Sequence, residues 1–282
     1  MSRALGFLIQ KVRPWRHEAA STVPGRYIPW LALVAAAGSV CVAWLHHAGL
    51  PPERGQATVG PAWDYVVCID PGHPTATSSG RAVYNGVSEL DVNWGVALKL
   101  GALLSKDKRI RVVWTRESRD QPMENSERAK VANEAHADLS VHLHCDVGPS
   151  RGFTVYFPDR QGTVAGKTGP AEEVLRASRE AAHALRNGMA RILRGVVKDR
   201  GIRTDCVTRV GHLNGSLTTS IFSEVPTVTV EMVFLSDRHD ARFIKTRQGQ
   251  ERMARAIVNG VTAYLRSTSQ TARRLADAAS DL

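Results

Sequence analysis

Short apolar runs alternate with amphipathic stretches between residues 63 and 266, and this order predicts a domain of strands and helices. The run at 65–69 is apolar throughout, which is typical of a strand covered on both faces. It stops at Asp70-Pro71-Gly72, because proline and glycine break a strand and turn the chain. Further strands are predicted at 110–115, 139–144, 152–157, which we place at a sheet edge, and 225–231.

Helices are predicted between these strands. Ser88 and Glu89 open one of them, since serine is a favoured N-cap residue and an acidic first turn complements the helix dipole. Its apolar residues recur at helical spacing, at Val92, Val96, Leu100 and Leu103. Other helices are predicted at 126–136, 170–196 and 253–265. The alternation indicates an α/β domain, with a mostly parallel or mixed twisted sheet of about six strands flanked by helices.

The first 62 residues have a different pattern. Residues 1–26 carry five basic residues and one acidic residue, and residues 28–45 carry no charge. Eighteen helical residues span roughly 27 Å, close to the hydrocarbon thickness of a bilayer of about 30 Å. We therefore predict a basic cytoplasmic segment at 1–26, a transmembrane anchor at 27–46 and a linker at 47–62. This orientation places the folded domain in the periplasm or otherwise outside the cytoplasmic membrane.

A cleaved signal peptide is the alternative reading of the apolar segment, and it would make the protein secreted. The domain itself is predicted to extend over 63–266. The remaining residues, 267–282, form a polar tail without a strong apolar stripe, which we expect to be frayed or disordered.

The composition is that of a folded protein, with 43% apolar residues in 282. Lys and Arg outnumber Asp and Glu by 37 to 27, which gives a formal charge of +10 and favours anionic partners. The basic residues are spread along the chain, and no nucleic-acid-binding motif is present. We therefore predict no nucleic-acid partner.

Four cysteines, Cys41, Cys68, Cys145 and Cys206, form no C-x-x-C pair and are too sparse for a disulfide scaffold. They are expected to be small apolar residues. Cys68 and Cys145 lie in predicted strands, so a bridge between them stays open.

Three chemically active side chains stand at predicted strand ends, namely His73, His144 and Glu231. In open α/β sheets the carboxyl ends of the strands form the usual ligand-binding edge. Glu89 joins them from a helix start, so that two imidazoles and two carboxylates are expected together. That set suits a catalytic zinc site, although spacing does not decide which glutamate is the ligand. His142 lies about 7 Å deeper along its strand and is expected to be a hydrogen-bonded buried histidine.

Many short motifs follow one another in a fixed order over residues 64–266. They are Ile69-Asp70-Pro71-Gly72-His73, Gly86-Val87-Ser88-Glu89, Asp91-Val92-Asn93, Thr115-Arg116, Glu127-Arg128-Ala129, Ala132-Asn133, Ala137-Asp138-Leu139, His144, Arg151-Gly152, Val225-Pro226, Val230-Glu231 and Phe234-Leu235-Ser236.

In these motifs the sequence resembles the zinc-dependent N-acetylmuramoyl-L-alanine amidases, which cleave bacterial peptidoglycan. The resemblance implies that His73, Glu89 and His144 bind Zn²⁺ and that Glu231 is the catalytic carboxylate. It also implies hydrolysis of the amide bond between N-acetylmuramic acid and L-alanine.

The sequence departs from the family pattern near the proposed site. Pro74 and Thr75 stand where a glycine pair usually follows the first histidine, and Asp146 replaces an asparagine. Met232 and Val233 replace the usual Thr-Gly after the catalytic glutamate. These changes bear on substrate fit and rate more than on the chemistry.

Three other functions are weighed against the amidase. One is a zinc peptidase acting on the stem peptide, and another is a membrane-tethered peptidoglycan-binding protein without turnover. A Cys145–His144 nucleophilic pair is disfavoured, because adjacent strand residues point to opposite faces. The 17 or so residues between Gly152 and the long helix leave no clear room for a helix that plugs the site. We therefore expect no built-in plug, and any activator protein is unidentified.

Overall fold

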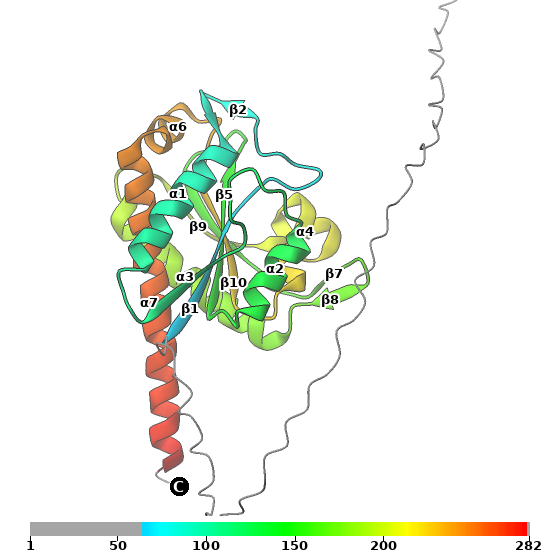
Figure 1. The fold of residues 1–282 in the computed structure, drawn as a ribbon, viewed down its shortest axis with the longest axis vertical. Helices are drawn as coiled ribbons and strands as arrows, with labels where there is room; N and C mark the ends of the chain where they lie inside the picture. Colours follow the sequence, from blue (N-terminus) through cyan, green and yellow to red (C-terminus); the bar gives the residue numbers. More distant parts are fainter. Residues whose placement is uncertain (1–63, 281–282) are drawn as a thin grey trace, which may run out of the picture. The chain divides into compact units, whose positions relative to one another are not determined.

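A six-stranded sheet in the order β4-β1-β5-β10-β6-β9 organises the part of the protein that the computed structural model describes, residues 64–280 (Figure 1). Strands β4, β1, β5 and β10 run parallel, β6 is antiparallel to β10, and β9 is parallel to β6. The ends of the four parallel strands therefore lie at one edge of the sheet, called the carboxyl edge below. The strands are β1 (Tyr65–Pro71), β4 (Ile110–Trp114), β5 (Leu139–Asp146), β6 (Phe153–Phe157), β9 (Asp199–Thr204) and β10 (Thr227–Phe234).

Helices cover both faces of this sheet. Helices α1, α3 and α7 cover one face, with α7 packed against both α1 and α3, and α2 lies on the other face, where it packs against α5. The helices are α1 (Glu89–Leu104), α2 (Asn125–Glu134), α3 (Glu172–Leu193), α4 (Arg209–Asn214), α5 (Thr218–Phe222), α6 (Arg238–Lys245) and α7 (Arg247–Ser280), with a short 3-10 helix η1 (Asp205–Val207). Two small hairpins are β2 (Val83–Tyr84) with β3 (Val87–Ser88), and β7 (Gly162–Val164) with β8 (Lys167–Gly169).

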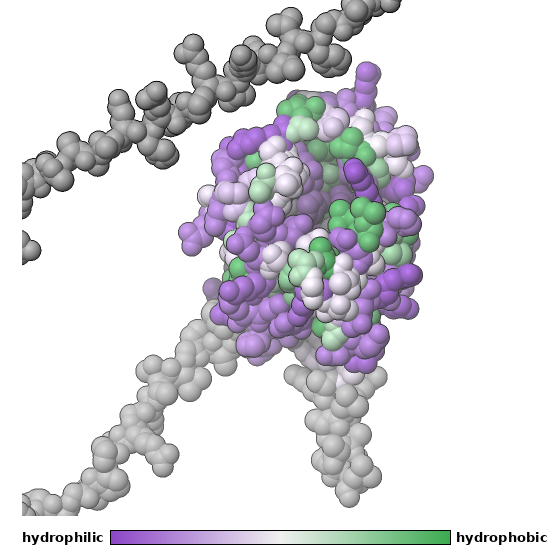
Figure 2. All heavy atoms as spheres, turned by 90° about the vertical axis from the view of Figure 1, so that its right-hand side faces the viewer, coloured by the Kyte–Doolittle hydropathy of each residue, from purple (hydrophilic) through white to green (hydrophobic). Residues whose placement is uncertain are grey.

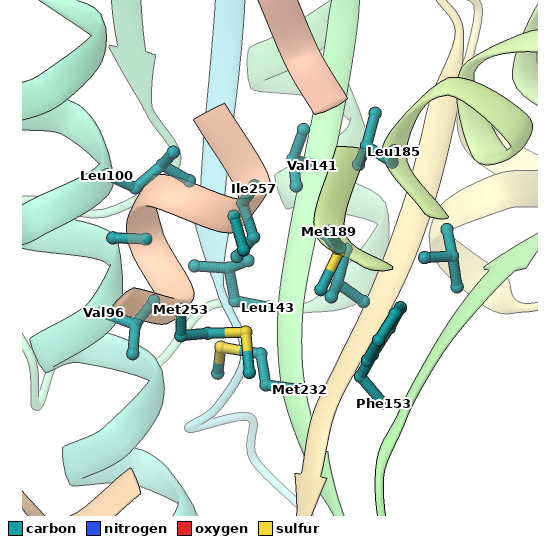
Figure 3. Close-up of a cluster of buried hydrophobic side chains, with 14 of the residues drawn as sticks. Val96, Leu100, Val141, Leu143, Phe153, Leu185, Met189, Met232, Met253 and Ile257 are labelled. Carbon is teal, nitrogen blue, oxygen red and sulfur yellow. The ribbon is translucent and has the colours of Figure 1, made fainter. Parts of the chain in front are cut away.

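The main hydrophobic core lies between the sheet and helices α1, α3 and α7. Figure 3 shows its side chains meeting in one layer: Val141 and Leu143 from β5, Phe153 from β6, Met232 from β10, Val96 and Leu100 from α1, Leu185 and Met189 from α3, and Met253 and Ile257 from α7. Helices α3 and α7 come so close that a Cβ on Gly188 would stand 2.4 Å from the backbone nitrogen of Gly260. Burial of each large apolar side chain contributes roughly 1.5–3 kcal/mol to the stability of the fold, so this layer stabilises the packing of the helices on the sheet.

The opposite face of the sheet has a different character. Side chains alternate along a strand, so β1 sends Val67 and Ile69 into the main core and Cys68 and Asp70 to the other face. There, a small apolar cluster under α2 includes Cys68 and Ala132. Towards the carboxyl edge, the buried residues of this face are polar rather than apolar.

The predicted fold class is confirmed, and two details of it are wrong. Strand β6 was expected at an edge, but β9 pairs with it and takes the edge position. The sequence of β9, Asp-Arg-Gly-Ile-Arg-Thr, has a single apolar residue and therefore shows no strand pattern. Helix α7 continues to Ser280, although the polar residues from 267 onward predicted a tail. The span from β6 to α3 contains the β7–β8 hairpin and no helix, as expected.

None of the helices within residues 64–280 is both long and apolar enough to cross a bilayer. The anchor predicted at 27–46, its basic flank at 1–26 and the linker at 47–62 lie outside the described residues, so these three stay predictions.

Cys68 and Cys145 are both buried free thiols, so the bridge left open above is not formed. The register explains this result, because Cys68 pairs with Ser140, five residues before Cys145 on the neighbouring parallel strand. Five residues of strand correspond to about 16 Å, far beyond the reach of a disulfide.

Candidate metal centre

His73, Glu89 and His144 meet at the carboxyl edge, with one potential ligand atom of each within 4.8 Å of the others. Glu89 stands between the two histidines. Its Oε2 lies 3.2 Å from Nε2 of His73, and its Oε1 lies 3.0 Å from Nδ1 of His144. The three side chains that the sequence pointed to are thus brought together from a loop, a helix start and a strand.

The loop after β1 delivers His73 in an unusual backbone conformation, with a φ of 60°. Two glycines make room for the histidines. A Cβ on Gly72 would lie 2.3 Å from Cε1 of His144, and a Cβ on Gly80 would lie 2.6 Å from Cβ of His73. On its far side, Nδ1 of His73 lies 3.0 Å from the Ser78 hydroxyl. The close approach of both imidazoles therefore requires glycine at positions 72 and 80.

Glu89 is the first residue of α1, directly after the N-cap Ser88, whose side chain accepts from the Asp91 backbone N–H. Oε1 of Glu89 also accepts from the backbone N–H of Cys145 at 3.1 Å. Burial by itself would raise the pKa of Glu89, but the hydrogen bonds and charges of His144 and His73 outweigh it and lower that pKa well below its usual value. Glu89 is therefore an anion at neutral pH.

Glu231 lies on β10 directly opposite His144 of β5 in the strand register. Within the described residues its Oε2 is buried and has no hydrogen-bond partner. Burial, then the negative charges of Glu89 and Asp146, raise the pKa of Glu231 well above its usual value. A raised pKa makes a carboxyl group a stronger base, which suits a group that accepts and returns a proton.

The donor set fits a zinc ion. Two imidazole nitrogens and one carboxylate oxygen are preferred zinc ligands, and three protein ligands leave a fourth position open, as in catalytic sites. Ligand bonds of about 2.0–2.1 Å in a tetrahedron place neighbouring ligand atoms about 3.3 Å apart. In this structure one ligand atom of each of the three residues lies within 4.8 Å of the other two, so the side chains already surround a common point. The unpartnered oxygen of Glu231 supplies the free carboxylate beside them.

A second polar cluster, which we call the Asp70 cluster, lies on the same sheet and consists of Asp70, Thr115, Arg128 and His142. The Asp70 carboxylate accepts from Thr115 Oγ1 at 2.5 Å and from Arg128 Nη1 at 2.6 Å, and it lies 2.7 Å from His142 Nδ1. His142 is thus a buried, hydrogen-bonded histidine, as expected from its depth. Sequence reasoning assigned no role to Arg128 or Thr115, although both stand in motifs of the resemblance, Glu127-Arg128-Ala129 and Thr115-Arg116.

A hollow of about 340 Å³ adjoins the metal candidate, with Glu89, Ser78, Tyr84 and Leu235 among its lining residues. A larger hollow of about 710 Å³, lined by basic residues such as Arg151 and Arg194, contains none of the four candidate residues. Of these two hollows, the smaller one is therefore the one that reaches the metal candidate, through Glu89.

The face that carries α2 and α4 is hollowed and mixes polar surface with apolar patches (Figure 2). The exposed apolar side chains on this side include Val207 of η1 and Val210 and Leu213 of α4.

Comparison with known proteins agrees with the site. The sequence profile of the family described as N-acetylmuramoyl-L-alanine amidase matches residues 67–263. The chain belongs to this amidase family. The match contains all four candidate residues and both polar clusters.

Individual amidases are distant relatives. The chain is 26% identical to N-acetylmuramoyl-L-alanine amidase LytC of Bacillus subtilis over 71% of its own length and 35% of LytC. It is 25% identical to N-acetylmuramoyl-L-alanine amidase AmiC of Escherichia coli over 79% of its own length and 58% of AmiC. The chain thus spans about one third to three fifths of the length of these two relatives. Among solved structures, the N-acetylmuramoyl-L-alanine amidase of Clostridium difficile 630 matches with a TM-score of 0.59 and 26% identity, over 72% of this chain and 97% of that one.

The departures from the family pattern have structural explanations in this amidase-family chain. Met232 and Val233 are fully buried and belong to the main core, so they support the strand that carries Glu231. Asp146 acts on the site through its charge, because it contributes to the raised pKa of Glu231. Pro74 is buried and its carbonyl oxygen is hydrogen-bonded to the backbone N–H of Met123, so the loop after His73 is held in place.

Proposed function

We propose that this protein is a zinc-dependent hydrolase that cleaves the amide bond between N-acetylmuramic acid and L-alanine in bacterial peptidoglycan. The observation that carries the proposal is the pairing of a His-Glu-His cluster with Glu231, a half-buried residue whose Oε2 is buried and has no hydrogen-bond partner among the described residues. Membership of the amidase family supports the same reaction.

His73, Glu89 and His144 would hold the metal, with Nε2 of His73 and Nδ1 of His144 facing the Glu89 carboxylate. When bound, zinc supplies a Lewis acid and lowers the pKa of a water molecule from 15.7 towards about 7. The Ser78 hydroxyl beside Nδ1 of His73 orients this imidazole so that Nε2 points inward.

Glu231 carries the proton in the proposed reaction. Its unpartnered Oε2 accepts a proton from the attacking water, and the same oxygen then delivers it to the amide nitrogen that leaves with L-alanine. The raised pKa of Glu231 suits both steps, because the group must hold the proton between them. The charge of Asp146 helps to keep this pKa high.

The place of action follows from the substrate. Peptidoglycan lies outside the cytoplasmic membrane, so we propose that residues 27–46 anchor the protein with its N-terminus in the cytoplasm and the catalytic domain in the periplasm or outside the cytoplasmic membrane. The uncharged run at 28–45 and the basic segment before it support this orientation. Protease digestion of intact spheroplasts should degrade the domain. Recovery of the mature protein in the medium would indicate the secreted alternative.

The decisive experiment incubates the purified full-length protein with peptidoglycan and identifies the products by mass spectrometry. We expect glycan strands with free lactyl carboxyl groups and intact stem peptides that begin with a free L-alanine amine. A chelator should abolish the reaction, and added Zn²⁺ should restore it. Release of D-alanine or of cleaved cross-links would indicate the zinc peptidase, and binding without products or bound zinc would indicate a non-catalytic peptidoglycan-binding protein.

A further inference from the structure

Arg128 of α2 is a charged residue outside the candidate catalytic set that is almost completely buried, with 1% of its surface exposed. Its guanidinium group contacts both ends of the loop segment that carries His73. Nη1 donates to the carbonyl oxygen of Pro71 at 2.9 Å, and Nη2 donates to the carbonyl oxygen of Pro74 at 2.9 Å. The two carbonyl groups belong to residues on either side of Gly72 and His73, so one planar group spans the loop at its base.

The guanidinium group of Arg128 makes further hydrogen bonds besides those to the loop. Nη1 also donates to Oδ1 of Asp70 at 2.6 Å, and Nε donates to the carbonyl oxygen of Met123 at 3.0 Å. Asp70 in turn is fixed by Thr115 and His142. Asp70 therefore compensates the buried charge, and the guanidinium has little freedom to move.

The conformation of His73 needs such support. A non-glycine residue at positive φ is strained, and this conformation persists only when its surroundings impose it. The flanking carbonyls determine where the backbone of His73 lies, and thus where Nε2 of His73 lies relative to Glu89.

We propose that Arg128 is a positioning residue for the metal centre. It holds the carbonyls of Pro71 and Pro74 and so keeps His73 in the conformation in which its Nε2 faces Glu89 before any metal binds. This inference rests on the proposed function, in which His73 is a zinc ligand. Residues that orient metal ligands typically change metal affinity by about 10–100-fold when they are replaced.

A lysine at position 128 tests this role, because it keeps the positive charge beside Asp70 but lacks the planar fork that reaches two carbonyls. Arg116 offers a matched control, since it is also 1% exposed and its Nη2 donates to the Pro71 carbonyl at 2.8 Å. Its other arm, however, donates to the carbonyls of Ser118 and Arg119 and does not reach Pro74.

The experiment measures the zinc affinity of the full-length protein by competition with a chromophoric chelator. Arg128→Lys should weaken zinc binding by about 10–100-fold. Arg116→Lys should weaken it by less than about threefold, because the guanidinium of Arg128 still spans the loop. At saturating zinc, Arg128→Lys should recover most of its kcat with an unchanged KM for peptidoglycan, which a general loss of folded structure would not produce.

Several results would overturn the proposal. One is a folded Arg128→Lys protein that binds zinc within twofold of wild type, and another is an equal loss in Arg116→Lys. If Arg128→Lys does not fold, Arg128→Gln takes its place, and failure of both to fold would show that Arg128 supports the whole domain rather than His73. A wild-type protein that binds no zinc would instead refute the proposed function.

Discussion

Two polar clusters lie side by side on the same sheet, and they differ in how their hydrogen bonds are satisfied. In the Asp70 cluster, both carboxylate oxygens of Asp70 have close partners, and the cation of Arg128 balances the charge. In the candidate metal centre of His73, Glu89, His144 and Glu231, Glu231 has a buried oxygen with no partner among residues 64–280, and its charged neighbours are anions.

The pKa directions follow this difference. Burial would raise the pKa of Asp70, but Arg128, His142 and Thr115 outweigh it and hold that pKa far below its usual value. For Glu231, burial and the charges of Glu89 and Asp146 act in the same direction and raise the pKa. The neighbours of these two carboxyl groups thus shift the two pKa values in opposite directions. The lowered pKa suits Asp70 to a structural ion pair, and the raised pKa suits Glu231 to proton transfer.

The largest expected effect is on catalysis. Glu231→Gln should lower the rate of peptidoglycan cleavage by about 10²–10⁴-fold, because it removes the group that accepts and returns the proton. The same change removes a buried charge without a partner, so the unfolding temperature should stay equal or rise. The exposed Glu173 of α3 gives the control, and Glu173→Gln should retain full activity. Wild-type activity in Glu231→Gln would mean that the catalytic carboxylate is another residue.

Asp70→Asn should produce the largest loss of stability. It leaves the guanidinium of Arg128 buried without a counterion, and breaking a buried ion pair in this way typically costs about 3–5 kcal/mol. Denaturant unfolding of the zinc-free protein measures the change. Asp205 is equally buried but is bonded to the Ser216 hydroxyl and the Leu217 backbone N–H rather than to a cation. Asp205→Asn should therefore cost less, and equal losses would contradict the contrast between the clusters.

The pH dependence of stability should separate the two carboxyl groups. The folded-state pKa of Asp70 is depressed, so its stabilisation is present above its unfolded pKa of about 3.9 and is lost as the pH falls further. The folded-state pKa of Glu231 is raised, so its ionisation destabilises the fold as the pH rises above about 4.3.

Unfolding free energies between pH 3 and pH 8 provide the test. The advantage of wild type over Asp70→Asn should shrink towards pH 3, and the advantage of Glu231→Gln over wild type should grow towards pH 8. Parallel curves for the three proteins would show that neither carboxyl group titrates as described.

The smallest effect is expected for Cys145, which follows the ligand candidate His144. Burial, then the charges of Glu89 and Glu231, raise the pKa of its thiol well above the usual value, so the thiolate nucleophile does not form. Cys145→Ala should keep peptidoglycan cleavage within about twofold of wild type, since the proposed chemistry runs through Glu231. A loss comparable to that of Glu231→Gln would revive a cysteine nucleophile.

Much of the site was predictable because its residues stand at the ends of predicted strands or at the start of a predicted helix. His73 and His144 follow apolar strand runs, Glu231 ends one, and Glu89 follows an N-cap, so parallel strands alone suggested that they meet. The motif resemblance then distinguished Glu89 from Glu231, which spacing did not. The alternation of strands and helices likewise predicted the mixed sheet.

Contacts between distant residues decided the rest. Strand β9 has one apolar residue and exists because its backbone pairs with β6, more than 40 residues earlier. Arg128 stands in the Glu127-Arg128-Ala129 motif, but only the fold brings it to Asp70 and to the carbonyls beside His73. The sequence by itself determined which elements form and which side chains stand at their ends, since those depend on neighbours along the chain. Only the tertiary structure decided which buried charges find partners, because the partners of Asp70 lie 45 to 72 positions away along the chain.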